Sequence, residues 1–123
     1  MNVLNEKDRR TADKLAANYM NEANITPQFR PSIETLLHSI LNKYTLHTHP
    51  IVVNAITNRE NWKEILLELF GDKIILAEYK TPGLSLAIEL KNKVKNKMPE
   101  IIFLQNHGLI ITTDCKSKVI ELT

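Results

Sequence analysis

The sequence contains few of the residues that would assign it to a specialised class of protein. It has one cysteine, Cys115, among 123 residues, so no internal disulfide can form and a reducing, cytoplasmic location is expected. We interpret Cys115 as a bystander, because the surrounding stretch TTDCKSK is polar and offers no activating pocket. No apolar run is long enough to cross a membrane, and the start MNVLNEKDRR is too charged for a signal peptide.

Excess charge of one sign is also absent. The net charge is +2, which is too small to predict a nucleic-acid partner. Four lysines at positions 91, 93, 95 and 97 lie in one helical pattern without interleaved aromatic residues, and we interpret them as a solvated helix face. Hydrophobic residues make up 43% and charged residues 24% of the chain, as in ordinary globular proteins. The expectation is one domain spanning residues 1–123.

Apolar spacing predicts alternating helices and strands. Helices are expected at residues 6–23, 31–42, 52–56, 60–72 and 84–97, and strands at 43–49, 73–79, 100–105 and 109–113. In the second helix, five residues form the predicted buried stripe: Ile33, Leu36, Leu37, Ile40 and Leu41. Gly71 is the predicted C-terminal cap of the fourth helix. Such alternation indicates an α/β domain built of layers.

Three of the four histidines are placed where they could bind one metal ion. His47 and His49 are two residues apart in YTLHTHPIVV, so in a strand they share a face at a separation of about 6.6 Å. His107 occupies the turn NHG directly after an apolar strand. Neutral imidazoles suit zinc and related divalent ions. The alternative is that each is an ordinary surface or core histidine, but the combined pattern favours a metal site.

The second predicted helix offers a carboxylate and the fourth histidine. Glu34 and His38 are four residues apart and share one side of that helix. Glu34 could simply be favoured by the helix dipole at its N-terminus. However, a very short connection links this helix to the histidine strand, so packing of the two could bring Glu34 to the same metal.

Four stretches in this order resemble the class II aldolase/adducin family. They are RPSIETLLHSIL, LHTHPIVVNAIT, EYKTPGLSLAIEL and IIFLQNHGLIITTD, and the resemblance runs from about Arg30 to the end of the chain. The resemblance implies a three-layer α/β/α domain with a mixed central sheet. Full members are longer and have glycine- and serine-containing loops that hold the substrate phosphate. This chain has no glycine before Gly71, so we expect a partial domain whose substrate-binding residues are unknown.

The resemblance also implies an activity and a role for each matching residue. His47, His49 and His107 would bind one divalent metal, usually zinc, and Glu34 would move protons as the catalytic residue. His38 would lie behind the ligands and support them, with plain packing as an equal alternative. The reaction implied is retro-aldol cleavage of a sugar or sugar phosphate through a metal-stabilised enediolate. Related members are epimerases, decarboxylases or non-catalytic adducin-like interaction domains. Family members are tetramers, so a homo-oligomer is expected, without nucleic-acid or membrane partners.

Overall fold

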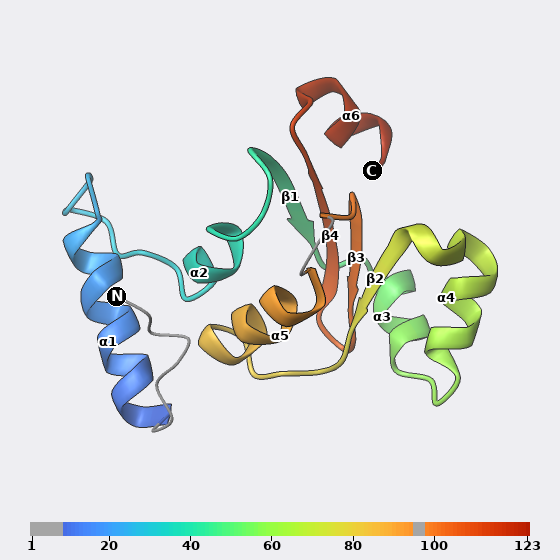
Figure 1. Cartoon of the computed structure of the whole chain (residues 1–123), viewed down its shortest axis with the longest axis horizontal. Coiled ribbons are helices and arrows are strands. Elements are labelled where there is room, and N and C mark those ends of the chain that lie inside the picture. Colours follow the sequence, from blue (N-terminus) through green and yellow to red (C-terminus); the bar gives the residue numbers. More distant parts are fainter. Residues whose placement is uncertain (1–8, 95–97) are drawn as a thin grey trace.

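A computed structural model describes residues 9–94 and 98–123. Figure 1 shows four strands in the middle of the molecule with helices on both sides. The elements are α1 (Arg9–Glu22), α2 (Thr35–His38), β1 (Tyr44–Thr48), α3 (Ile51–Thr57), α4 (Trp62–Phe70), the 3-10 turn η2 (Gly71–Lys73), β2 (Ile74–Ala77), α5 (Leu84–Val94), β3 (Ile101–Leu104), β4 (Gly108–Thr113) and α6 (Lys116–Glu121). The predicted α/β class is confirmed.

The strands form one mixed sheet in the order β1-β4-β3-β2. β2 and β3 run parallel, and a helix lies between them in the chain, as parallel pairing requires. β3 and β4 form an antiparallel hairpin, and β1 pairs antiparallel with β4 on the outside. The first strand therefore lies beside the last one, although about sixty residues separate them in the chain.

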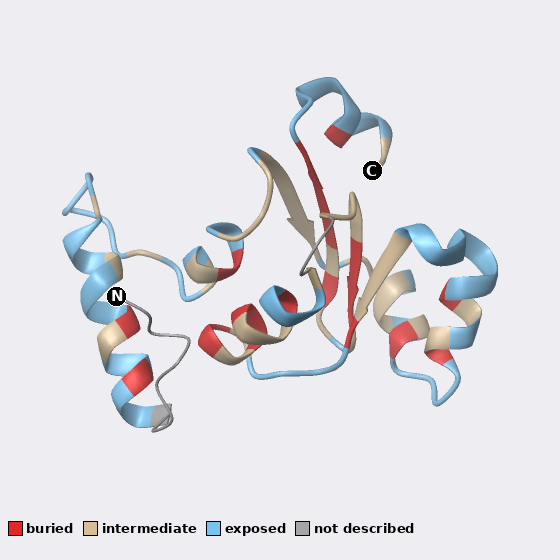
Figure 2. Cartoon of the chain, in the orientation of Figure 1, coloured by how far each residue is buried: buried red, intermediate tan, exposed pale blue. Residues whose placement is uncertain are grey.

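Each face of the sheet is covered by helices, which gives the three predicted layers. On one face α2 and α5 pack against a core of Leu37, Ala77, Leu86, Leu90, Ile102, Leu104 and Ile110. On the other face α3 and α4 contribute to a smaller core around Trp62, Leu66 and Phe103. Figure 2 shows buried residues concentrated in the two central strands and on the helix sides that face them. Alternation along each strand divides its side chains between the two cores.

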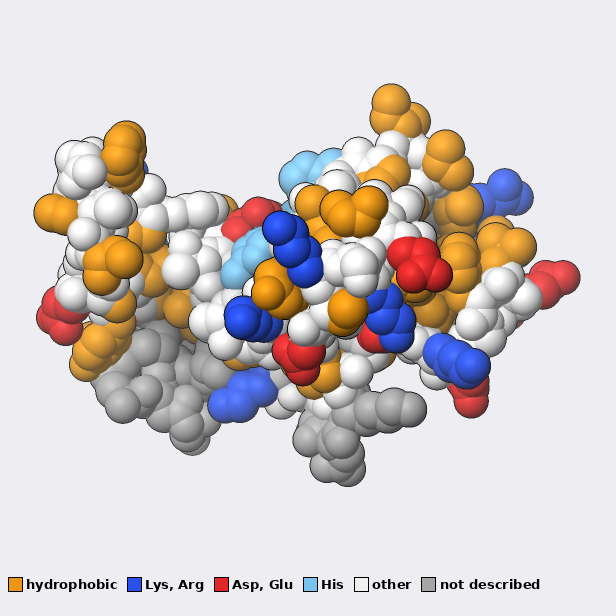
Figure 3. All heavy atoms as spheres, turned by 90° about the horizontal axis from the view of Figure 1, so that it is seen from above, with side chains coloured by type: hydrophobic (Ala, Val, Ile, Leu, Met, Phe, Trp, Pro, Cys, Tyr) orange, Lys and Arg blue, Asp and Glu red, His pale blue; other side chains and the backbone are white. Residues whose placement is uncertain are grey.

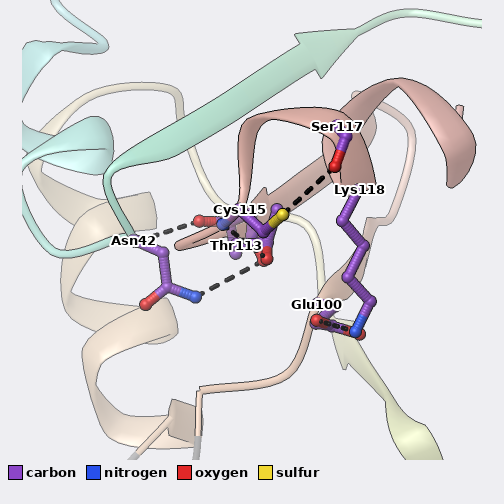
Figure 4. A network of polar contacts seen from close by, with 7 residues as sticks. Asn42, Glu100, Thr113, Cys115, Ser117 and Lys118 are labelled. Atoms are coloured by element: carbon purple, nitrogen blue, oxygen red, sulfur yellow. Dashed lines mark hydrogen bonds and ion pairs between the residues drawn. The ribbon is translucent and has the colours of Figure 1, made fainter.

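Polar contacts hold the end of the β1–β4 pair at which β1 begins and β4 ends. The fully buried Thr112 hydroxyl accepts a hydrogen bond from the backbone N–H of Asn42 at 2.9 Å, just before β1 begins. Beyond β4, the Cys115 thiol lies 3.2 Å from the Ser117 hydroxyl, and Lys118 pairs with Glu100 (Figure 4). The Lys118–Glu100 pair joins α6 to the residue just before β3.

The second helix is much shorter than predicted. The sequence pattern suggests a helix at 31–42, but only α2 (Thr35–His38) is helical. After it, the N–H groups of Ile40 and Leu41 bond to carbonyls three residues back, at Leu37 and His38, so the chain tightens into turns. The stripe is buried only in part: Leu37 is fully buried, Ile40 and Leu41 pack against the same core, and Ile33 is 57% exposed.

Other boundaries agree more closely with the predictions. Gly71 follows the last residue of α4 with φ of 68°, a conformation that glycine adopts without strain. Lys91 and Lys93 are exposed on α5, as expected for a solvated face. Lys95, Lys97 and the predicted helical residues 6–8 lie outside the described residues. Within the described ranges, every helix is too short or too polar to traverse a bilayer.

Candidate metal centre

The pairing of β1 with β4 brings the predicted histidines together. Thr48, the last residue of β1, lies opposite Leu109 near the start of β4. His49 follows Thr48 in the chain, and His107 precedes the first residue of β4. Both therefore lie at the same edge of the sheet, and the predicted H-x-H pair meets the predicted turn histidine.

The turn NHG has a specific backbone requirement at each side of His107. Asn106 has φ of 51°, a left-handed conformation that asparagine tolerates better than most residues. Gly108 has no room for a side chain, since a Cβ there would lie 2.3 Å from the Thr48 carbonyl oxygen and 2.7 Å from Cδ2 of His49. The sequence predicts NHG as a turn that carries His107, but the separate requirements at Asn106 and Gly108 emerge only from the structure.

Glu34 reaches the cluster from α2. Its backbone N–H donates to the Ser32 hydroxyl at 3.2 Å, so Ser32 rather than Glu34 satisfies the orphan donor at the helix start. Three residues further on, Leu37 is fully buried and anchors α2 in the core. Because α2 has only four residues, its dipole gives little reason for a carboxylate at Glu34. The carboxylate instead faces two imidazoles.

Four side chains converge at this edge of the sheet. The Glu34 carboxylate oxygens lie 3.1 Å from Nε2 of His107 and 3.4 Å from Nδ1 of His47. Ring centroids of His47, His49 and His107 are separated by 4.9–5.1 Å. One donor atom from each of the four residues lies within 4.8 Å of all the others, so the group could hold a metal ion. Figure 3 shows histidine side chains reaching the surface beside an acidic side chain.

Burial keeps His47 neutral. The His47 side chain is only 5% exposed, and burial is the main reason that its pKa falls from 6.5 to about 4, outweighing the attraction of Glu34. The unfolded chain would bind a proton at His47 near pH 6.5, whereas the folded protein binds it only near pH 4. The metal-free protein should therefore lose stability as the pH falls between these two values.

The donor set and two buried nitrogens fit a divalent metal. Nε2 of His47 and Nδ1 of His107 are buried and lack hydrogen-bond partners among the described residues. A buried ring nitrogen without a partner is costly. On each ring the other nitrogen is the one that faces Glu34, so a bound ion would satisfy an orphaned nitrogen only where the ring coordinates through it. Three imidazoles and one carboxylate also match the ligands that zinc prefers. The residues present are therefore compatible with such an ion.

His38 and Cys115 lie outside the four-residue cluster. The His38 ring is exposed, with its centroid 6.1 Å from that of His47, so a supporting role for His38 stays a prediction. Cys115 follows β4 at the opposite end of the β1–β4 pair from His49. Its thiol is exposed, and the neighbouring Ser117 hydroxyl is the main cause of its lowered pKa.

An apolar groove of about 450 Å³ lies between α1 and α2, lined partly by Tyr19, Ile25 and Phe29. None of the four clustered residues lines it. The groove is therefore separate from the candidate metal centre and does not identify residues that would bind a substrate there.

The fold and the histidine–glutamate cluster together define an α/β domain with a candidate metal site at one sheet edge. The family model of the class II aldolase and adducin N-terminal domain matches residues 5–116. The chain belongs to this family. The predicted resemblance is confirmed, and it extends further toward the N-terminus than the four motifs that suggested it.

The chain is similar to a small part of a much longer protein. A Bacillus subtilis (strain 168) protein named uncharacterized oxidoreductase YuxG is 33% identical over 99 residues, covering 76% of this chain and 14% of that protein. The chain thus spans only about one seventh of that curated relative, whose name refers to an oxidoreductase and not to an aldolase.

Solved structures share the fold. The N-terminal class II aldolase domain of a conserved protein from Thermoplasma acidophilum matches with a TM-score of 0.80 and 26% identity, over 98% of this chain and 55% of that chain. An aldolase II superfamily protein from Pseudomonas syringae matches with a TM-score of 0.50 and 18% identity, over 73% of this chain and 40% of that one. The second match supports the fold alone.

Proposed function

We propose that this chain is a divalent-metal-dependent aldolase that cleaves a sugar or sugar phosphate by retro-aldol chemistry. The observation that carries the proposal is the convergence of Glu34, His47, His49 and His107 within 4.8 Å. Membership of the class II aldolase and adducin family supports the reaction class. Three histidines and a glutamate gathered at one place favour a metal-dependent reaction over a domain that only binds another protein.

His47, His49 and His107 would hold one divalent ion, with zinc favoured by three imidazole donors. When bound, the ion supplies a Lewis acid that stabilises negative charge on substrate oxygens. The chain contributes a ring at His47 that is already neutral at pH 7, because burial lowers its pKa to about 4. That ring can donate a lone pair without first losing a proton.

Glu34 would act as the general base. Its carboxylate lies against two of the histidines and is 28% exposed, so a substrate could reach it. In the direction of aldol addition, Glu34 would take the proton from the donor carbon, and in cleavage it would return a proton to that carbon. Its place beside the proposed ligands favours this role over that of a helix-start residue.

Metal content tests the site. We expect the purified protein to bind about one divalent transition metal per chain, and His49→Ala to lose most of it. His49 is exposed, so the substitution should leave the fold intact. The control is Lys91→Ala, which truncates an exposed side chain of α5 outside the cluster and should keep the ion. Full metal content in His49→Ala would refute the assignment.

Proton exchange tests the base. Glu34→Gln keeps the size of the side chain but cannot accept a proton, so exchange of the donor's carbon-bound hydrogen with solvent should slow by about 10²–10⁴-fold, together with aldol cleavage. Both are measured at equal metal loading, with Glu64→Gln on the exposed side of α4 as control. Equal exchange in wild type and Glu34→Gln would rule out Glu34 as the base.

We also propose that the chain works as a homo-oligomer. Ile51 and Val52, at the start of α3 and two to three residues after His49, are 86% and 70% exposed. Large apolar side chains exposed beside a candidate site are typical of surfaces covered by a partner. Light scattering of wild type and of a doubly substituted Ile51→Ser, Val52→Ser variant tests this, since only the variant should lose subunits.

A further inference from the structure

Helix α3 connects the two segments that carry the candidate ligands. At its N-terminal end, Pro50 separates α3 from His49. At its C-terminal end, Thr57 contacts the turn that carries His107. One short helix therefore adjoins the H-x-H pair at one end and contacts the turn that carries His107 at the other.

The contact at Thr57 is a buried hydrogen bond. Thr57 is 0% exposed, and its hydroxyl oxygen accepts the backbone N–H of Asn106 at 3.1 Å while the hydroxyl donates to the carbonyl of Asn54 at 3.4 Å. A polar side chain buried this deeply normally makes hydrogen bonds, because burial without them is costly. The Thr57 hydroxyl both donates and accepts one, and the bond that it accepts comes from the turn.

The backbone group that Thr57 holds belongs to the residue immediately before His107. Asn106 has φ of 51°, a conformation that is uncommon for a non-glycine residue, although asparagine tolerates it better than most. Within the turn, the N–H of His107 bonds back to Leu104 and that of Gln105 bonds to Ala77. The N–H of Asn106 instead bonds to Thr57.

We propose that Thr57 is a positioning residue that fixes the Asn106–His107 turn, and through it the His107 ring, for metal binding. The inference rests on the proposed metal site and adds a residue that touches neither metal nor substrate. Groups that support a ligand from behind commonly change metal affinity by about 10–100-fold when removed. Thr57 would act through the backbone, not through the imidazole.

Cobalt binding separates positioning from general stability. Thr57→Val keeps the shape and removes the hydroxyl, and Thr57→Ser restores it. Thr112→Val is the matched control, because Thr112 is also fully buried and its hydroxyl also accepts a backbone N–H, from Asn42 at the opposite end of the β1–β4 pair. Each variant is titrated with Co²⁺ while the visible absorption spectrum is recorded, and its urea midpoint is measured without metal.

We expect Thr57→Val to bind Co²⁺ at least tenfold more weakly with an altered spectrum, and Thr57→Ser to resemble wild type. Thr112→Val should lose a comparable amount of urea resistance but keep affinity and spectrum. Wild-type cobalt affinity in Thr57→Val would overturn this inference while leaving the proposed metal site in place. Equal losses of cobalt affinity in Thr57→Val and Thr112→Val would have the same consequence. Absence of cobalt binding by the wild type would overturn the proposed function and this inference together.

Amide exchange in the wild-type protein supplies a test that needs no variant to fold. If Thr57 holds the turn, the Asn106 amide proton should exchange slowly in the metal-free protein, like amides of the central strands. Rapid exchange, as in a solvent-exposed turn, would overturn the proposal.

Discussion

Substitution of Gly108 by alanine is the sharpest test of how the histidine edge is assembled. The added Cβ would lie 2.3 Å from the carbonyl oxygen of Thr48 and 2.7 Å from Cδ2 of His49. The His49 ring is exposed and can turn away, but Thr48 is the last residue of β1 and its carbonyl cannot move without the strand. Gly108→Ala should therefore displace His49 and push β1 away from β4 at the site.

The free-energy cost of Gly108→Ala depends on which atom the added Cβ would contact. Overpacking usually costs about 1–3 kcal/mol, and a backbone contact this short places Gly108→Ala in the upper part, at about 2–3 kcal/mol. For a chain of this size, each kcal/mol lowers the melting temperature by about 4 °C. The expected decrease is therefore roughly 8–12 °C. Metal affinity should fall by at least the ~10–100-fold that follows loss of a supporting group, because here a proposed ligand moves.

Calorimetry and cobalt titration measure the two effects, and Gly71→Ala is the control. Gly71 has nothing within 4 Å of an added Cβ, but its φ of 68° and ψ of −155° lie in a region that only glycine normally occupies. Alanine there should therefore cost about 1–3 kcal/mol of backbone strain but leave the site alone. Gly71→Ala should melt earlier with unchanged cobalt affinity. A Gly108→Ala protein with wild-type melting temperature and wild-type affinity would refute the close approach of β1 to the turn.

Three further outcomes follow from the same structure. Lowering the pH from 6.5 to 4 should cost the metal-free protein up to about 3 kcal/mol through His47, measured by urea unfolding; His47→Gln should flatten this dependence. Leu37→Ala should cost about 2–5 kcal/mol in the same assay, because Leu37 is fully buried, and should weaken metal binding by loosening α2. Lys118→Ala should change stability by less than about 1 kcal/mol, since its ion pair with Glu100 is half-exposed; a larger loss would mean that α6 depends on this pair.

Local sequence patterns account for the two halves of the candidate site. The alternating stretch YTLHTH predicts a strand with His47 and His49 on one face, and β1 (Tyr44–Thr48) with a 4.9 Å separation of the two rings agrees. The turn NHG predicts a tight connection between apolar strands, and His107 lies there. Both features depend only on residues within a few positions, which is the range over which propensity and alternation act.

The arrangement of those halves depends on contacts that local patterns do not encode. Pairing of β1 with β4 joins Thr48 to Leu109 across about sixty residues, and no strand order was predicted from the sequence. The second helix was predicted too long, because a stripe such as Leu37, Ile40 and Leu41 reaches the core equally well from a short helix followed by turns. The sequence does not predict the roles of Thr57 and Gly108, because they depend on contacts with distant segments. Thr57 accepts a hydrogen bond from Asn106, and Gly108 leaves room for Thr48 and His49.

Because the donors come from three separate segments, the proposed site can exist only in the folded chain. Glu34 lies before α2, His47 and His49 at the end of β1, and His107 in the β3–β4 turn. An ion bound by all of them would link the outer strand, the central hairpin and a covering helix. Binding to the folded state alone would stabilise the protein by about 2.7 kcal/mol at one hundred times the dissociation constant. An ion held by the H-x-H pair alone would bind the unfolded chain as well and would stabilise the fold less. The size of the stabilisation therefore indicates whether Glu34 and His107 share the ion with the strand histidines.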